Sequence, residues 1–442
     1  MTSICIDGFN LTMPKASGIA TYGRNLLKAA EGVGIDTQVL YGPASGRKAS
    51  NVVNEALLID ARPPAPQDNR RRRVQRFQQT LLSRFGRTAY PIVPSGEVIW
   101  PSGAQPPAGH LWAVQDLFVR SNRCFQKYGK LTPLTFKASC EVPAPDLMHW
   151  TAPLPIHAPG RPNIYTFHDL IPLRLPYTTL GDKARYMAMS LEVASRADHI
   201  VVVSEATRQD VVRLLGVDER RVTNTYQSVQ IPEPATLPNK SDVALEIEGV
   251  FGLGWKSYFL HFGAVEPKKN LGRIVEAYLA SGVEAPLVLI GGRAWLDEGE
   301  VGLLQQVKRD GGANADRIFQ YDYMSFSMLN NLIRGAKGVL FPSLYEGFGL
   351  PVLEAMALST AVLTSTGGAL PEVAGDAALV VDPYDVRAIA RGIKALDADD
   401  ALRNDLEVRG RRQAAKFSCE AYQARLLEAY SAVGVTPSAS YG

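Results

Sequence analysis

Two glutamates stand on either side of a glycine pair in the segment LFPSLYEGFGLPVLEAMA, residues 340–357. The apolar run 338–341 predicts a buried strand, and Pro351 suits the first turn of a helix. Glu346 is therefore expected on a strand-to-helix loop, and Glu354 on the helix that this loop begins. The two carboxylates do not share one helical face, so any common ligand would have to extend from the loop to the helix.

This loop could bind an anion that has hydroxyl groups on both sides. Helix starts have unpaired N–H groups and partial positive charge, which favour phosphate. Gly347 and Gly349 let the backbone approach an anion closely, because neither has a Cβ. Glu346 and Glu354 would accept hydrogen bonds from hydroxyl groups. The combination suits a nucleoside diphosphate sugar, although the spacing alone also allows a purely structural loop in which Glu354 serves only the helix dipole.

The elements around this loop alternate between strands and helices. Short β-branched runs predict strands, and longer amphipathic patterns between them predict helices. The predicted strands cover residues 3–6, 163–167, 199–203, 258–262, 287–290, 338–341 and 361–364, and clear helices cover 182–196, 206–215, 271–280, 386–396 and 418–432. This alternation predicts an α/β fold of βαβ units with doubly wound parallel sheets.

The length of 442 residues favours two domains. Three prolines lie within residues 231–240, where they favour extended backbone. We therefore predict a first Rossmann-like domain over 1–235, a linker over 236–256 and a second such domain over 257–415. A final helical segment, 416–442, could pack on either domain and so could cross back to the first.

Composition excludes several classes of protein. Apolar residues make up 46% of the chain and charged residues 21%, as in ordinary globular proteins, and the net charge of +3 gives no reason to expect nucleic acid. The four cysteines are far apart, which indicates reduced thiols in a cytoplasmic protein. No apolar run approaches the roughly 20 residues of a membrane helix, and the N-terminus is typical of a first strand and not of a signal peptide.

One basic segment, RRRRVQRFQQTLLSRFGR, runs from Arg70 to Arg87. Val74, Phe77 and Leu81 recur at helical spacing, and Phe85 continues the stripe, so we predict an amphipathic helix with arginines on its other face. The helix could simply cover the N-terminal sheet. Alternatively, its arginines could attract anionic lipid at about 1 kcal/mol per basic residue.

Taken together, the motifs resemble the retaining glycosyltransferases of family 4, which have the GT-B fold. EGFGLPVLEAMA is similar to the family's E-x7-E motif. Further similar segments are SGIATYGRNLL (17–27), TFHDLIPLRLP (166–176), VVVSEATRQDVVRLLGV (201–217), FLHFGAVEPKKNLGRIVEAY (259–278), LVLIGGRAW (287–295) and GGALPEVAGDAALVVDP (367–383). They occur in the family's order and cover most of the chain outside residues 30–145.

The resemblance implies two Rossmann-like domains facing a cleft, with the donor nucleotide on the second and the acceptor on the first. By similarity, Glu354 would bind the ribose hydroxyls and Glu346 a hydroxyl of the transferred sugar. The backbone after Glu346 would lie near the sugar and the diphosphate, which makes donor-binding positions of Gly347, Phe348, Gly349 and Leu350.

The cations expected near the diphosphate depart in part from the family pattern. Lys269 would neutralise the leaving diphosphate, whereas Lys268 is expected to be surface charge. Many relatives have an arginine where this chain has Ala264, so a second fixed cation is missing there. Arg293 could supply it, or could be a surface residue of its loop.

The first domain contributes a histidine and a glycine to the expected cleft. The resemblance places His168, at the end of a strand, near a donor-sugar hydroxyl or the attacking acceptor. Asp169 would orient the imidazole or merely close the following turn. Gly18 precedes a helix whose N–H groups could face the diphosphate, or is an ordinary loop glycine. His149 ends another strand-like run, and we expect it to pack near the acceptor groove.

The family mechanism is usually described as front-face attack with the leaving phosphate as base, so Glu346, His168 and Lys269 would act by positioning and charge stabilisation. No metal or other cofactor is expected. Asp397 and Asp399 have the Asp-x-Asp spacing of metal-dependent transferases, but they lie in a polar connection far past the nucleotide motifs. The chain has neither the GxGxxG run of dehydrogenases nor the GxSxG run of serine hydrolases.

The style of the HDLIP and EPKKN segments resembles mannosyltransferases of bacterial surface polysaccharide assembly, which implies transfer of mannose from GDP-mannose to a growing glycan in O-antigen or lipopolysaccharide synthesis. The acceptor is expected to be lipid-linked, and the protein either free in the cytoplasm or peripheral at the cytoplasmic face of the inner membrane through residues 70–87. Three alternatives stay open: another GDP- or UDP-sugar as donor, a GT-B sugar-nucleotide epimerase, and a non-catalytic GT-B scaffold subunit.

Overall fold

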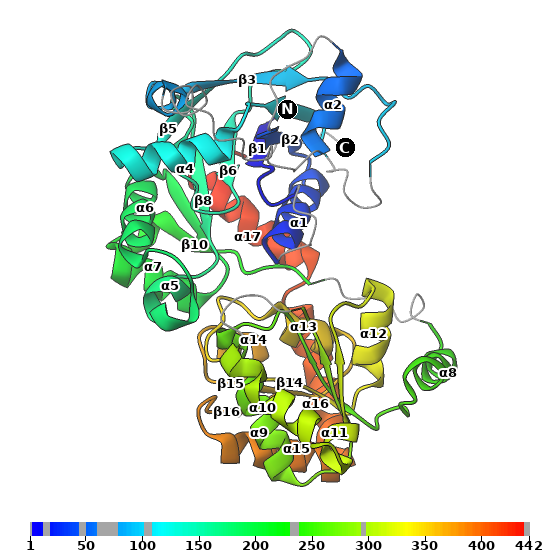
Figure 1. Cartoon of the computed structure of the whole chain (residues 1–442). Helices are drawn as coiled ribbons and strands as arrows, with labels where there is room; N and C mark the ends of the chain where they lie inside the picture. The colour runs from blue at the N-terminus through cyan, green and yellow to red at the C-terminus, as the bar shows by residue number, and fades with distance from the viewer. Residues whose placement is uncertain are drawn as a thin grey trace.

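The computed structural model describes residues 2–11, 18–43, 50–59, 78–100, 108–229, 238–292 and 298–436. Within these ranges the chain forms two α/β domains, each built on one largely parallel sheet with helices around it (Figure 1). The strands that the sequence predicts are all present, with ends that differ by a residue or two. The predicted architecture of two Rossmann-like domains is confirmed.

The described part of the first domain contains a ten-stranded sheet in the order β10-β9-β8-β6-β1-β2-β4-β3-β5-β7. Its central strands are buried along their whole length, as expected for parallel strands with helices on both faces. The strands are β1 (Ser3–Asp7), β2 (Asp36–Tyr41), β3 (Arg87–Ile92), β4 (His110–Ala113), β5 (Thr132–Phe136), β6 (Leu147–Trp150), β7 (Ile156–His157), β8 (Asn163–Phe167), β9 (His199–Val202) and β10 (Val222–Asn224). The helices are α1 (Gly18–Gly32), α2 (Asn51–Ile59), α4 (Leu117–Tyr128), α5 (Ile171–Arg174), α6 (Lys183–Arg196) and α7 (Glu205–Leu215).

The second domain contains, among its described residues, a six-stranded parallel sheet in the order β13-β12-β11-β14-β15-β16. The strands are β11 (Phe259–Phe262), β12 (Leu287–Ile290), β13 (Ile318–Tyr321), β14 (Gly338–Phe341), β15 (Val362–Ser365) and β16 (Leu379–Val381). The helices are α8 (Lys240–Phe251), α9 (Leu271–Ser281), α10 (Glu298–Asp310), α11 (Ala313–Asp316), α12 (Phe326–Gly335), α13 (Leu350–Ala357), α14 (Leu370–Ala374), α15 (Val386–Ala398) and α16 (Asp400–Ala415). The central strands β11 and β14 carry the segments that lead into the candidate site.

The predicted linker, residues 236–256, contains a helix. Asn239 caps α8 by accepting the N–H of Ser241, and Val243 and Ile247 are buried on the helix's inner face. These two apolar side chains dock α8 on the second domain, and among the described residues of the linker only 238–239 and 252–256 lie outside the helix.

The C-terminal helix α17 (Cys419–Ser431) returns to the first domain, where Figure 1 shows it beside α1. Gln423 donates to the carbonyl of Ala29 in α1, and the Tyr430 hydroxyl lies 2.9 Å from Nδ1 of His149 in β6. The chain therefore crosses between the domains twice, once before α8 and once between α16 and α17.

The basic segment differs from the predicted amphipathic helix. Residues 70–77 lie outside the described ranges, residues 78–83 are helical, and β3 begins at Arg87. Gly86 has a φ of 113°, which turns the chain out of the helix. The buried side chains of this turn are Thr80 and Ser83, whereas Phe85 is 76% exposed. The predicted apolar stripe is therefore not the buried face in the described part of the segment.

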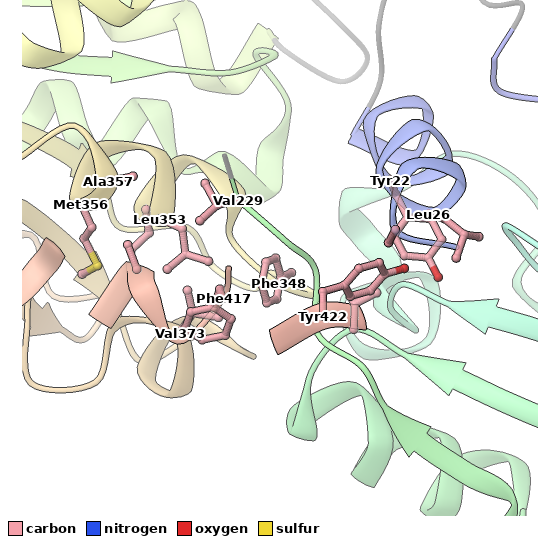
Figure 2. Close-up of a cluster of buried hydrophobic side chains, with 14 of the residues drawn as sticks. Tyr22, Leu26, Val229, Phe348, Leu353, Met356, Ala357, Val373, Phe417 and Tyr422 are labelled. Carbon is pink, nitrogen blue, oxygen red and sulfur yellow. The ribbon is translucent and has the colours of Figure 1, made fainter. Parts of the chain in front are cut away.

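A cluster of buried apolar side chains crosses from one domain into the other (Figure 2). Phe348 of the second domain lies 5.7 Å, ring centre to ring centre, from Phe417, and Phe417 lies 5.2 Å from Tyr226 of the crossing segment. Tyr422 of α17 contacts Tyr22 of α1 edge to face. Because Phe348 belongs to the loop that carries Glu346, this cluster ties that loop to both crossings of the chain.

Candidate functional site

The loop between β14 and α13 is held by two backbone hydrogen bonds to neighbouring loops. The N–H of Leu344 donates to the carbonyl of Lys268 at 2.7 Å, and the N–H of Ala369 donates to the carbonyl of Glu346 at 3.0 Å. Gly349, with a φ of 107°, is the residue from which α13 starts, and a Cβ there would lie 2.7 Å from Leu370. Glycine is therefore required for the chain to turn into the helix as closely as it does.

Glu346 is buried and paired with two lysines. Its Oε1 lies 2.7 Å from Nζ of Lys269, and its Oε2 lies 3.6 Å from Nζ of Lys268. Burial alone would raise the pKa of Glu346, but attraction to Lys269 and Lys268 lowers it below its ordinary value. The carboxylate is therefore ionised at neutral pH and is ready to accept hydrogen bonds.

Lys268 is not surface charge, which corrects the expectation from the sequence. Its side chain is only 20% exposed and lies 3.7 Å from Glu266 as well as near Glu346. Burial opposes its charge, yet the nearby carboxylates, Glu346 first, raise the pKa of Lys268 above the ordinary value. The short 3-10 turn Pro267–Lys269 presents both lysines inward, so two cations stand here although Ala264 offers none. Arg293, the other candidate, lies outside the described residues.

Lys269 is positioned by an aromatic ring and by the residue that follows it. Its ammonium lies 4.7 Å from the ring centre of Phe341, at the end of β14. The next residue, Asn270, is fully buried with a φ of 64°, and its amide donates to the carbonyls of Pro342 and Pro383. Asn270 thus joins three loops at the carboxyl edge of the sheet. Sequence reasoning missed this role, although Asn270 stands in the EPKKN segment and asparagine favours left-handed backbone.

Glu354 lies on α13 and faces a cavity of about 910 Å³ between the two domains. Arg24 and Asn25 of α1 line the cavity from the first domain, and Phe326 and Asn330 of α12 line it from the second. Burial raises the pKa of Glu354 above its ordinary value, and Lys269 offsets part of that shift. The two glutamates therefore occupy different surroundings, one in an ion pair and one on a cavity wall.

His168 lies at the junction of the two domains. Its Nε2–H donates to the carbonyl of Thr151, and its ring contacts Tyr22 edge to face at 4.8 Å. Burial lowers the pKa of His168 below its ordinary value, so the imidazole is neutral at pH 7. Gly347 of the second domain packs against the His168 carbonyl so closely that a Cβ on it would lie 2.1 Å from that oxygen. The predicted acceptor-side and donor-side segments therefore touch.

The remaining predicted positions in the first domain are Asp169, Gly18 and His149, and the contacts of Asp169 and His149 are structural. The Asp169 carboxylate accepts the N–H of Ile171 at 3.0 Å and so closes the turn that follows. Gly18 is the first residue of α1. His149 is fully buried between the hydroxyls of Tyr430 and Thr166, and burial lowers its pKa to about 3.

Asp397 and Asp399 have the spacing of a metal-binding pair, but each has another partner in the structure. Asp397 pairs with Lys337 at 2.7 Å, and Asp399 caps α16 by accepting the N–H of Leu402. Among the described residues, no group of three or more His, Cys, Asp or Glu side chains is arranged to hold a metal ion.

Two contacts between the domains were not foreseen. Glu372 of α14 accepts the N–H groups of Glu205 and Ala206 at the start of α7, both at 2.9 Å. The Tyr345 hydroxyl donates to Asp210 of α7 at 2.7 Å. Because Tyr345 precedes Glu346 directly, α7 fixes the loop from the side of the first domain. Contacts across domains leave no periodic signal in the sequence.

Two protein-family models match this chain, one in each domain. The model of the family described as Glycosyltransferase Family 4 matches residues 97–229, and that of Glycosyl transferases group 1 matches residues 252–413. An Escherichia coli protein named O-antigen chain mannosyltransferase B is 34% identical over 60% of this chain and 69% of its own length. A serotype-specific mannosyltransferase of Escherichia coli, WbdA, is 29% identical over 57% of this chain, but the match spans only 31% of that longer protein.

Solved structures agree on the fold. The sucrose-phosphate synthase of Thermosynechococcus elongatus superimposes with a TM-score of 0.66 at 17% identity and covers 98% of both chains. WaaG, described as a glycosyltransferase involved in lipopolysaccharide biosynthesis, gives a TM-score of 0.59 at 14% identity over 98% of this chain and 100% of its own. The GT-B fold is thereby confirmed, and the chain belongs to the family 4 and group 1 glycosyltransferases.

Proposed function

We propose that this glycosyltransferase moves mannose from GDP-mannose to a hydroxyl of a growing glycan, with retention of the anomeric configuration. The donor would bind on the second domain, with its diphosphate at Lys269 and the start of α13 and its sugar at Glu346. The ribose would reach Glu354 on the cavity wall. The acceptor would approach from the first domain, beside His168.

The observation that carries the proposal is the buried contact between Lys269 and Glu346 at the junction of the domains. Paired in this way, an ammonium stands ready for the charge of a leaving diphosphate, and a carboxylate stands ready for a sugar hydroxyl. Preorganised charge of this kind costs no reorganisation at the moment of reaction. Donor binding would exchange the lysine–glutamate contact for lysine–phosphate and glutamate–hydroxyl contacts.

Retention without a metal is part of the same proposal. Lys269 would supply the positive charge at the diphosphate that a divalent ion supplies in other transferases, and Lys268 would help to keep Glu346 ionised. Glu346, held ionised by both lysines, is a weak base, and burial lowers the pKa of His168 and so weakens it as a base. Deprotonation of the acceptor by the departing phosphate, on the face where it leaves, then needs no protein base.

The choice of mannose, and of surface polysaccharide as the pathway, rests on relatives. The Escherichia coli relative at 34% identity and RfbU of Salmonella typhimurium, at 28% identity over 56% of this chain and 63% of its own length, are both named O-antigen chain mannosyltransferases. We extend that activity to this chain and propose a lipid-linked acceptor. No helix in the described ranges is long and apolar enough to cross a membrane. The exposed side chains of Leu82 and Phe85, in the described part of the basic segment, support a peripheral contact with anionic lipid.

A donor panel tests the proposal. Purified protein is incubated with GDP-mannose, GDP-fucose, UDP-glucose, UDP-galactose and UDP-N-acetylglucosamine, with EDTA, and with or without a mannose-terminated acceptor. We expect release of GDP from GDP-mannose alone, stimulation by the acceptor, and an axial product linkage by NMR. Epimerised donor without transfer would identify an epimerase, no turnover of any donor would favour a scaffold subunit, and dependence on added magnesium would contradict the metal-free mechanism.

A further inference from the structure

A second cavity opens at the carboxyl edge of the first domain's sheet, away from the junction of the domains. It measures about 360 Å³ and lies between α2 and the ends of β2 and β4. Pro43 follows β2, Gln115 follows β4, and Arg87 begins β3, which runs antiparallel to β4 and so starts at the same edge. Sites for small ligands range from about 300 to 1,000 Å³, so this cavity has room for a single small unit.

The lining has the chemistry that binds sugar rings. The Arg87 guanidinium donates to the Gln115 carbonyl at 3.1 Å, which fixes its position at the cavity wall. Asn54 of α2 also lines the cavity. Tyr90 is 38% exposed and presents an aromatic ring, with the Lys137 ammonium 5.8 Å from the ring centre. Donors and acceptors around one apolar ring suit a polyol, whose C–H face can stack while its hydroxyls form hydrogen bonds.

The order of the strands gives the distance between this cavity and His168 at the proposed transfer site. His168 follows β8, and β8, β6, β1, β2 and β4 are consecutive parallel neighbours. Their carboxyl ends therefore share one edge. Four strand spacings of about 4.8 Å separate β8 from β4, or roughly 19 Å. That distance exceeds one sugar and corresponds to several linked units.

We infer that this cavity, here called the distal subsite and defined by Asn54, Arg87, Tyr90 and Gln115, binds an interior hexose of the acceptor glycan. The growing end of the glycan would lie at His168 while a residue several units back occupies the distal subsite. The inference rests on the proposed function, because it assumes a glycan acceptor. It adds that the enzyme distinguishes acceptors by their length.

Acceptors of graded length test the distal subsite. We expect the KM of the wild-type protein to fall from a mannose monosaccharide to a mannose tetrasaccharide. Arg87→Ala and Tyr90→Ala should each raise the tetrasaccharide KM by about tenfold, the usual loss for a charged or aromatic contact. The monosaccharide KM and donor hydrolysis without acceptor should stay unchanged. Arg123→Ala, an exposed arginine on α4, is the matched control and should change neither KM.

Direct titration of the mannose tetrasaccharide into the protein, without donor, separates this inference from the proposed function. Tetrasaccharide binding that weakens about tenfold in Tyr90→Ala supports the distal subsite even where no donor is turned over. Because Tyr90 is partly exposed, its truncation leaves the buried core intact. Equal losses for short and long acceptors, or no loss for either, would overturn the inference.

Discussion

The two sheet edges that meet at the candidate site differ in charge. On the second domain, Glu346 lies in a buried cluster with Lys268 and Lys269, and the two lysines hold the pKa of its carboxyl below the ordinary value. On the first domain, His168 is neutral and is surrounded by a carbonyl and an aromatic ring. Under the proposed function, the charged edge would hold and release a diphosphate, and the neutral edge would receive the attacking hydroxyl. The proposed function therefore predicts that charge governs binding of the donor and that the acceptor binds without a charged contact at His168.

The largest effect should come from the charged edge. Lys269→Ala removes the ammonium closest to Glu346, and we expect kcat to fall on the order of 10²–10³-fold, because a preorganised contact to the leaving group is lost. Donor hydrolysis and transfer are both measured at saturating GDP-mannose.

Lys268→Ala is the matched control for that change. Lys268 sits beyond 3.5 Å from either carboxylate, so we expect a loss of about fivefold or less. Equal losses in the two variants would remove the distinction between a lysine that contacts the diphosphate and one that only supports Glu346.

The second-largest effect should come from the contact between the sheet edges of the two domains. Gly347→Ala would place a Cβ 2.1 Å from the His168 carbonyl, and the loop must shift to avoid it. We expect kcat to fall about a hundredfold, because a displacement of roughly 1 Å at a reacting centre has that cost. Gly302→Ala on α10, where nothing lies within 4 Å, should leave the rate unchanged. Full activity of Gly347→Ala would mean that the domains do not meet in this way during catalysis.

A smaller effect is expected at the cavity wall. Glu354→Gln replaces the proposed ribose acceptor by an amide, and we expect the donor KM to rise about tenfold with little change in kcat. Glu420→Gln, on an exposed residue that lines the same cavity from α17, should change the donor KM far less. A fall in kcat at constant KM for Glu354→Gln would place this carboxylate at the reacting sugar instead.

The smallest effect concerns the neutral edge. Burial lowers the pKa of His168 below the ordinary histidine value of about 6.5. The imidazole should therefore be neutral at about pH 6.5 and above. Its neutral form therefore stabilises the folded state above that pH, and this contribution is lost as the pH falls through the lowered pKa. NMR titration of the His168 ring protons should give a midpoint below 6.5, and a midpoint above it would contradict a neutral acceptor edge.

The sequence predicted the second domain's edge better than the first. The strand ends, the glycine loop and the positions of Glu346 and Lys269 all follow from short local patterns. What it missed there was the burial of Lys268, because neighbouring residues in a short 3-10 turn have no periodicity that separates inside from outside. Asn270 was missed because its role depends on three loops that are distant in sequence.

On the first domain, the strands β2, β3, β4, β5, β7 and β10 were not predicted. Of these, β3 and β5 contain Pro91 and Pro133, and proline argues against a central strand. The distal subsite lies among these elements, so no motif pointed to it. The contacts of Glu372 and Tyr345 with α7 also depend on how the two domains meet, which no local pattern encodes.

A crystal structure with GDP and a non-hydrolysable mannose donor tests the central claim most directly. The account predicts Nζ of Lys269 within about 3 Å of a diphosphate oxygen and a carboxylate oxygen of Glu346 at a similar distance from a mannose hydroxyl. A diphosphate bound elsewhere, with Lys269 and Glu346 still paired only to each other, would contradict it.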